Sequence, residues 1–161
     1  MIPPIANALD VIERNETSGR TGWMFGHRID PITGVANQYH DGIDLGCPIG
    51  TPVFAVMDGT VLSMGTARMG GNYIQIEHDG DIAVTGYCHL SYVHAGLRPG
   101  TFVREGEIVA YTGNTGASTG PHLHFQMWRR GENKMRVGVD PLPLLKACIV
   151  ERPDFTPVGG L

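Results

Sequence analysis

The sequence Gly120-Pro121-His122-Leu123-His124-Phe125 joins a loop of small residues to an extended segment. Side chains alternate between the two faces of a strand, so His122 and His124 fall on the same face. The preceding residues, 114–121, are mostly small or turn-forming and predict a loop that leads directly into the strand. We therefore expect one strand to present two imidazoles close to its first residue.

A second stretch far upstream, His40-Asp41-Gly42-Ile43-Asp44, offers matching chemistry. His40 and Asp44 are four positions apart and share one face of an extended segment. Gly42 and the glycines and proline that follow argue against a helix. Two histidines and one aspartate from the two stretches can then converge on one point. Three such ligands plus an open position are typical of a catalytic zinc site, so the sequence predicts a zinc (Zn2+) hydrolase.

Composition sets the class of protein. The chain has 161 residues, 42% of them hydrophobic and 17% charged, which is typical of one globular domain. The net charge is −4 and no block of lysine or arginine occurs, so we expect no nucleic-acid partner. The 23 glycines are spread between short apolar runs and indicate many tight turns.

These short runs predict an all-β fold, an antiparallel β sandwich or partly open barrel with small peripheral helices. Hairpins are expected over residues 51–63, 72–90 and 102–111. Short helices are expected at 5–14 and 142–148, the second capped by Asp140. Three parts follow: an N-terminal lead over 1–20, a domain over 21–148, and a proline- and glycine-rich tail over 149–161.

The three cysteines, Cys47, Cys88 and Cys148, exclude a complete set of disulfides because their number is odd. None belongs to a CxxC pair, so a zinc site made of thiolates is not expected. Buried or half-buried free thiols are the simpler interpretation.

Histidine must carry the proton transfers, because the HExxH motif that would supply a glutamate is absent. Within the HxH pair one histidine can bind the metal while the other approaches the substrate, and spacing leaves both assignments open. His89, near a strand end beside Tyr87, is a further candidate proton carrier. His27, His78 and His94 lie in turn-like, polar surroundings and are not expected to take part in the chemistry.

Several motifs occur together and in a fixed order: Phe25-Gly26-His27-Arg28, His40-Asp41-Gly42-Ile43-Asp44, Asp58-Gly59-Thr60-Val61, Gly71-Asn72-Tyr73-Ile74, Tyr87-Cys88-His89-Leu90 and Thr115-Gly116-Ala117-Ser118-Thr119-Gly120-Pro121-His122-Leu123-His124-Phe125. These motifs and their order resemble those of the LytM/lysostaphin-type zinc endopeptidases, peptidase family M23. The resemblance covers residues from about 22 to 145, which is most of the chain. HxGxD alone would be a weak signal, and the combination with YxHL and the last motif is a specific one.

The resemblance implies an antiparallel β core with zinc in a groove between loops. It implies His40, Asp44 and His124 as metal ligands and His89 and His122 as the catalytic pair. His122 would be the general base, while His89 would hold the water or stabilise the oxyanion. Arg28 and Asn72 match groove positions and are expected to bind substrate, although a turn salt bridge and a turn hydrogen bond explain them equally well.

The implied substrate is the peptide part of bacterial peptidoglycan, with Gly-Gly bridges and D-Ala–diaminopimelate crosslinks both in the family's range. The first residues show no basic stretch followed by an apolar one, and no stretch could span or insert into a membrane. We expect a soluble chain that acts at the cell wall, in the periplasm or outside the cell. A phage lysis enzyme or virion-associated enzyme fits this pattern, with other virion proteins as partners, and so does an excised domain.

Three alternatives remain open at this point. A catalytically silent relative could regulate other wall hydrolases, although such relatives lose metal ligands and all five positions are filled here. A sugar phosphotransferase domain is similar in fold and carries an HxGxD-like string, but it lacks PHLHF. A purely structural virion component would keep the site without using it.

Overall fold

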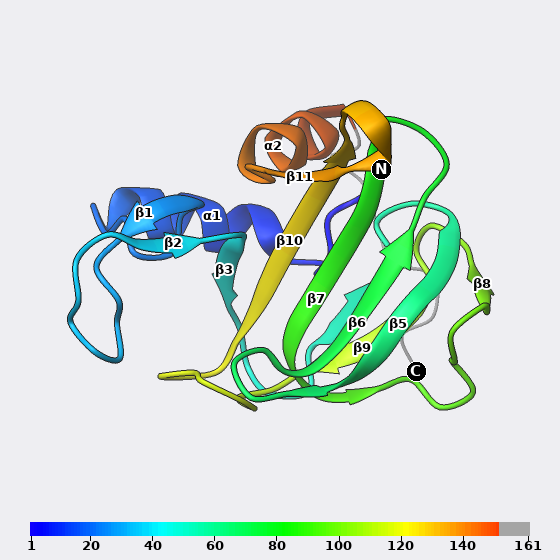
Figure 1. Ribbon diagram of the computed structural model, residues 1–161. Coiled ribbons are helices and arrows are strands. Elements are labelled where there is room, and N and C mark those ends of the chain that lie inside the picture. Colours follow the sequence, from blue (N-terminus) through cyan, green and yellow to red (C-terminus); the bar gives the residue numbers. More distant parts are fainter. Residues whose placement is uncertain (152–161) are drawn as a thin grey trace.

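A long antiparallel sheet forms the body of the protein, and the computed structural model describes residues 1–151. Along its main path the strands follow the order β11, β10, β7, β6, β5 and β8. Their bounds are Arg136–Val139 (β11), His122–Arg130 (β10), Ile82–Val93 (β7), Gly71–Glu77 (β6), Gly59–Ala67 (β5) and Phe102–Val103 (β8). Figure 1 shows β10, β7, β6 and β5 side by side across the centre of the molecule.

Shorter strands attach to this path and curl it. β3 (Ile43–Gly46) pairs with β10, and β9 (Ile108–Thr112) pairs with both β7 and β4 (Pro52–Phe54). β1 (Gly26–Arg28) and β2 (Gln38–His40) form a separate two-stranded sheet. The strand pairs within residues 1–151 are antiparallel. The prediction of an all-β, antiparallel fold with small peripheral helices is confirmed.

The core lies on one face of β10, β7 and β6, where alternate residues point inward. Tyr87 and Phe125 are fully buried, and their rings lie 5.3 Å apart between centroids. Around them pack apolar side chains of at most 1% exposure: Ile43, Leu45, Ile74, Ile76, Leu90, Leu123 and Met127. Each such side chain stabilises the fold by about 1.5–3 kcal/mol relative to an exposed one, so β10 is held firmly in place.

Two α-helices flank the sheet within the described residues (Figure 1). α1 (Ala8–Thr17) begins later than the predicted 5–14 and buries Ala8, Val11 and Ile12. α2 (Leu142–Glu151) matches the predicted second helix, and the backbone N–H of Leu142 donates to Asp140 Oδ1 at 2.9 Å as expected. A 3-10 turn, η1 (Glu132–Lys134), links β10 to β11. Neither α-helix in this part of the chain is long and apolar enough to cross a bilayer.

The segment before α1 also packs against the sheet. Ile2 N–H donates to the Val56 carbonyl at 2.8 Å, and Phe54 N–H donates to the Pro4 carbonyl at 2.9 Å. Ile2 and Ile5 are at most 1% exposed. The predicted tail, 149–161, lies mostly outside the described residues.

One predicted hairpin is confirmed and two are wrong. β6 and β7 pair directly, as the turn at Asp79-Gly80 predicts. β4, however, pairs with β9 rather than with β5, and β8 pairs with β5 rather than with β9. A turn signal says where the chain bends but not which distant strand competes for the partner.

The environments of the three cysteines match the prediction, whereas the environment of His78 does not. Cys47 and Cys148 are buried, Cys88 is half-buried, and no disulfide joins them within residues 1–151, as predicted. His78 is only 2% exposed, although its polar neighbours suggest a surface position. Its Nδ1–H donates to the Asp58 carbonyl at 2.8 Å, and Thr85 Oγ1 lies 2.9 Å from its Nε2. It therefore belongs to a buried structural network.

Candidate metal and catalytic site

Strand pairing brings the predicted site residues together at the first residues of β10. In the register between β3 and β10, Asp44 lies opposite His124. In the register between β7 and β10, Cys88 lies opposite His124, so His89 follows close by. His40 is the last residue of β2. Four strands from distant parts of the sequence thus meet around His124.

His40 and Asp44 do not lie on one continuous strand, contrary to the simplest interpretation of their spacing. β2 ends at His40 and β3 begins at Ile43, with a break at Asp41-Gly42. A Cβ atom on Gly42 would lie 2.4 Å from the carbonyl oxygen of Phe125. Glycine is therefore required where the chain crosses β10, and this crossing aims both side chains at His124.

Three candidate ligand atoms form a tight triangle. His40 Nε2 lies 3.1 Å from Asp44 Oδ1 and 3.0 Å from His124 Nδ1, and the last two atoms are 2.8 Å apart. Ligands at zinc–nitrogen and zinc–oxygen distances of about 2.0–2.2 Å in a tetrahedron lie roughly 3.3 Å from one another. An expansion of a few tenths of an ångström would fit the ion, and these residues form a candidate metal cluster.

The hydrogen bonds on the far side of each ring support the same interpretation. His40 Nδ1 lies 2.7 Å from the Met24 carbonyl, so it carries the proton and leaves a lone pair on Nε2. His124 Nε2 lies 3.1 Å from Asp41 Oδ1, so its proton is there and the lone pair is on Nδ1. With Asp44, three electron-rich atoms face one another, and a cation between them satisfies all three.

The charges agree with this geometry. Burial opposes charge on Asp44, but the contacts with His124 and His40 outweigh burial and hold the pKa of Asp44 well below its usual range. Burial also opposes charge on His124, yet its contacts with Asp41 and Asp44 raise the pKa of His124 to about 9. The surroundings therefore favour a positive charge at this point, whether a proton or a metal cation.

His89 and His122 stand beside the triangle. Their ring centroids are 4.6 Å apart, and the rings of His89 and His124 are 5.9 Å apart. Nδ1 of His122 lies 2.7 Å from the Gly120 carbonyl, and its Nε2 lies 3.5 Å from Asp44 Oδ1. Nδ1 of His89 lies 2.8 Å from the Thr115 carbonyl. Each ring thus donates its proton to a backbone carbonyl and keeps the lone pair of Nε2 for another partner.

His89 is held in a strained backbone conformation, with φ at 59°. Its N–H donates to the Gly70 carbonyl at 2.7 Å. The Thr115 hydroxyl donates to the Leu90 carbonyl at 2.7 Å and accepts the Asn72 N–H at 3.0 Å. His89 and Leu90 are therefore fixed by Gly70 and by the loop that contains Thr115, which is itself held by Asn72 at the start of β6.

The two predicted substrate-binding residues have partners within the protein. Arg28 Nη1 donates to Asp44 Oδ2 at 2.9 Å, on the oxygen that the triangle does not use, and also to the Gly22 carbonyl. Asn72 donates through Nδ2 to the Ser91 carbonyl at 3.0 Å and accepts from Thr66 at 2.7 Å. Arg28 lines the cavity described below, whereas Asn72 is not among its lining residues.

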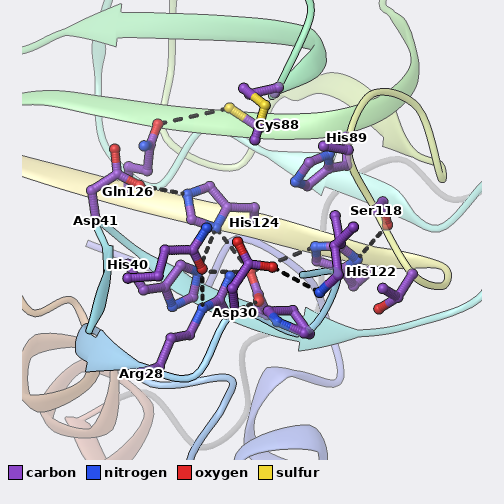
Figure 2. A pocket seen from close by; sticks show the side chains of 18 of the residues that line it. Arg28, Asp30, His40, Asp41, Cys88, His89, Ser118, His122, His124 and Gln126 are labelled. Atoms are coloured by element: carbon purple, nitrogen blue, oxygen red, sulfur yellow. Dashed lines mark hydrogen bonds and ion pairs between the residues drawn. The ribbon is translucent and has the colours of Figure 1, made fainter. Parts of the chain in front are cut away.

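A cavity of about 370 Å³ opens over these groups. Figure 2 shows His40, His124, His122 and His89 pointing into it, with Asp41 and Gln126 beside the ring of His124. Its walls come from three loops, which contribute Asp30, Pro31 and Ile32; Met69 and Gly70; and Ala117, Ser118 and Thr119. An extended peptide could enter such a groove and reach all the histidines at once.

A family model described as peptidase family M23 matches residues 38–137. The chain belongs to peptidase family M23. Its relatives include the peptidoglycan DD-endopeptidase ShyA of Vibrio cholerae, 38% identical over 114 residues, which are 70% of this chain and 26% of ShyA. The M23 chain thus spans about a quarter of the length of the curated relatives it matches, such as ShyA.

Solved structures agree with this assignment. The catalytic domain of lysostaphin from Staphylococcus simulans has a TM-score of 0.66 at 34% identity, covering 78% of this chain and 90% of that domain. The catalytic domain of the prophage-encoded M23 protein EnpA from Enterococcus faecalis has a TM-score of 0.56 at 32% identity. That match covers 70% of this chain and 82% of the EnpA domain. The resemblance to family M23 noted in the sequence is confirmed.

The sequence did not identify the groups that surround the site in this M23 chain. Asp41 contacts His124, and backbone carbonyls of Met24, Thr115 and Gly120 orient three histidines. Carbonyl partners carry no sequence signal. The position of Asp41 inside the HxGxD motif was the one available signal, but strict alternation turns Asp41 away from His40.

Proposed function

We propose that this chain is a zinc-dependent endopeptidase that hydrolyses peptide crosslinks of bacterial peptidoglycan. One observation carries the proposal: three lone pairs, from His40, Asp44 and His124, converge next to two further histidines in an open cavity. A silent relative would have no need for all five groups in this arrangement. Membership of family M23 also argues against the phosphocarrier alternative.

His40, Asp44 and His124 would hold the zinc ion. A zinc ion bound there supplies Lewis acidity, which polarises a substrate carbonyl and makes water acidic near neutral pH. The Met24 carbonyl fixes the tautomer of His40, and Arg28 neutralises the second oxygen of Asp44.

His122 is the general base in this proposal. Burial lowers the pKa of His89 to about 4, so His89 keeps a proton poorly at neutral pH. His122 Nε2, which faces the Asp44 side of the site, then accepts the proton of the attacking water. The water oxygen bonds to the peptide carbonyl carbon, the C–N bond breaks, and His122 passes the proton to the leaving amine.

His89 holds the water. Its Nδ1–H is directed to the Thr115 carbonyl, so its Nε2 can accept a hydrogen bond but cannot donate one while the ring is neutral. A neutral acceptor suits the orientation of water better than the stabilisation of an oxyanion, which needs a donor. The contacts of Thr115 and Asn72 around His89 support a fixed position for this acceptor.

Digestion of purified peptidoglycan from several wall types, followed by mass spectrometry, tests the proposal. We expect new peptide termini with the zinc-loaded protein and none after zinc is chelated. The mass of each terminus distinguishes cleavage at Gly-Gly from cleavage at D-Ala–diaminopimelate. Absence of cleavage on every wall type, with zinc bound, would contradict the proposal and favour a structural or regulatory role.

The setting is a further part of the proposal: a phage lysis or virion-associated enzyme that reaches the wall from the periplasm or from outside. Its support is the likeness to the prophage-encoded EnpA domain. Mass spectrometry of the proteins in purified virions of the producing phage tests the virion-associated form. Detection of the chain in the particles would support that form, and its presence only in the lysate would support the lysis form.

A further inference from the structure

The two ring nitrogens of His124 have different surroundings. Nδ1 faces Asp44 and His40 at 2.8 and 3.0 Å, where the metal would lie. Nε2, on the opposite edge of the ring, lies 3.1 Å from Oδ1 of Asp41. Asp41 belongs to the turn between β2 and β3 and is therefore beside the candidate metal point without being directed into it (Figure 2).

The outer partners of the two histidine ligands also differ. The outer nitrogen of His40 donates to a neutral acceptor, the Met24 carbonyl, at 2.7 Å. The outer nitrogen of His124 donates to a carboxylate. A negative acceptor increases the electron density of the imidazole and makes the opposite nitrogen a better metal donor. His124 is therefore the ligand whose strength the protein can tune most.

Asp41 needs an anchor, because its side chain is 54% exposed and would otherwise rotate freely. Gln126 supplies one. It lies two positions after His124 on the same face of β10 and is 8% exposed. The Oε1 atom of Gln126 accepts a hydrogen bond from the Cys88 thiol at 3.7 Å, so its amide group can donate elsewhere. The Gln126 side chain is hydrogen-bonded to the Asp41 carboxylate.

We propose that Asp41 is a positioning residue for the metal site: it fixes the Nε2–H tautomer of His124 and strengthens His124 as a zinc ligand, while Gln126 holds the Asp41 carboxylate in place. The inference rests on the proposed zinc site. It assigns a role to the residue between His40 and Gly42 and, through Gln126, links that residue to Cys88 on β7.

Zinc affinity tests the role directly, without any measurement of activity. The zinc dissociation constants of the full chain and of Asp41→Asn and Asp41→Ala are measured by competition with a chromophoric chelator. We expect zinc to bind about 10–100-fold more weakly to Asp41→Ala, as for other losses of an outer partner. Asp41→Asn should lie between, because its amide oxygen still accepts the proton of His124 but carries no charge.

Asp30 offers a matched control. It lines the same cavity, and its Oδ1 accepts the backbone N–H groups of Ile32 and Thr33 rather than a histidine. Asp30→Asn removes the same charge and keeps those hydrogen bonds, so we expect unchanged zinc affinity. An equal loss in Asp30→Asn would show a general charge effect and overturn the inference, as would wild-type affinity in Asp41→Ala.

A second measurement needs no variant. Nitrogen–proton correlation spectra of the zinc-loaded protein should show His124 bound through Nδ1, with a protected proton on Nε2 shifted downfield by a carboxylate acceptor. A rapidly exchanging Nε2 proton would overturn the inference while leaving the zinc site intact. Failure of the unmodified protein to bind zinc at all would instead overturn the proposed function, and this inference with it.

Discussion

Nδ1 of His124 lies 2.8 Å from Oδ1 of Asp44, although 80 positions separate the two residues. The contact exists because β3 and β10 pair with these residues opposite each other. One strand register therefore assembles two of the three candidate ligands, and the crossing at Gly42 adds His40. Any change that shifts this register would disperse the site.

Substitution of the two histidines of β10 should separate metal binding from catalysis. His124→Ala removes an atom of the triangle, so we expect loss of both zinc and activity. His122→Ala should keep zinc and lose activity by about 10²–10⁴-fold, which is typical for a missing general base. Metal analysis and peptide release are measured for both, with His94→Ala as an exposed control outside the cavity. Zinc retained by His124→Ala but lost from His122→Ala would reverse the ligand assignment.

We expect Arg28 to act on the metal site through Asp44, in addition to or in place of binding the substrate. Its guanidinium donates to Asp44 at 2.9 Å, and the two side chains are 13% and 21% exposed. Loss of this outer partner in Arg28→Gln should weaken zinc binding roughly tenfold. Arg129→Gln, which breaks an exposed pair with Asp81, should leave zinc binding unchanged. A higher KM with normal zinc affinity would support the substrate-binding role expected from the sequence.

The Thr115 hydroxyl should matter for turnover but not for the metal. It bridges the Leu90 carbonyl and the Asn72 N–H, next to strained His89. In Thr115→Val both backbone groups lose a partner, at a cost of about 1–3 kcal/mol, and His89 can relax. We expect kcat to fall roughly tenfold, from about 1.4 kcal/mol of lost positioning, with unchanged zinc affinity. Loss of zinc at normal kcat would contradict a role for Thr115 in positioning His89.

Local and nonlocal features of this chain were not equally predictable. The β6–β7 hairpin and the Asp140 cap depend on neighbouring residues, and both follow from the sequence. The pairing of β4 with β9 depends on a strand more than fifty residues downstream, so a nearby turn signal pointed to the wrong partner. For the site, alternation placed His122 and His124 together, but Asp41 was missed because the chain breaks at Gly42 instead of continuing as a strand.

His78 should make stability depend on pH. Burial lowers the pKa of His78 in the folded state, while the unfolded value is about 6.5. The unfolded chain therefore binds more protons below that pH. The contribution of neutral His78 to the free energy of unfolding is complete above pH 6.5. It is lost as the pH falls toward the folded-state pKa of His78.

Urea unfolding of the chelator-treated protein at pH 7.5 and 5.5 measures this effect. His78→Gln should cost about 1–3 kcal/mol at pH 7.5, because it disrupts the contacts with Asp58 and Thr85. The variant should then lose less stability than the wild type between the two pH values. Equal losses in both proteins would show that His78 does not control this transition.

Removal of zinc should weaken the fold without abolishing it. The core around Tyr87, Phe125 and Leu123 is fully buried and is made by strand packing rather than by the ligands. A metal that binds only the folded state stabilises it by about 2.7 kcal/mol at a concentration of 100 times Kd. For a chain of this size, that corresponds to roughly 5–11 °C in Tm.

Calorimetry with and without chelator should show this shift with one cooperative transition in each case. His124→Ala should show no shift, because it should not bind zinc. Complete unfolding on chelation, as in small zinc-dependent domains, would instead make the metal structural.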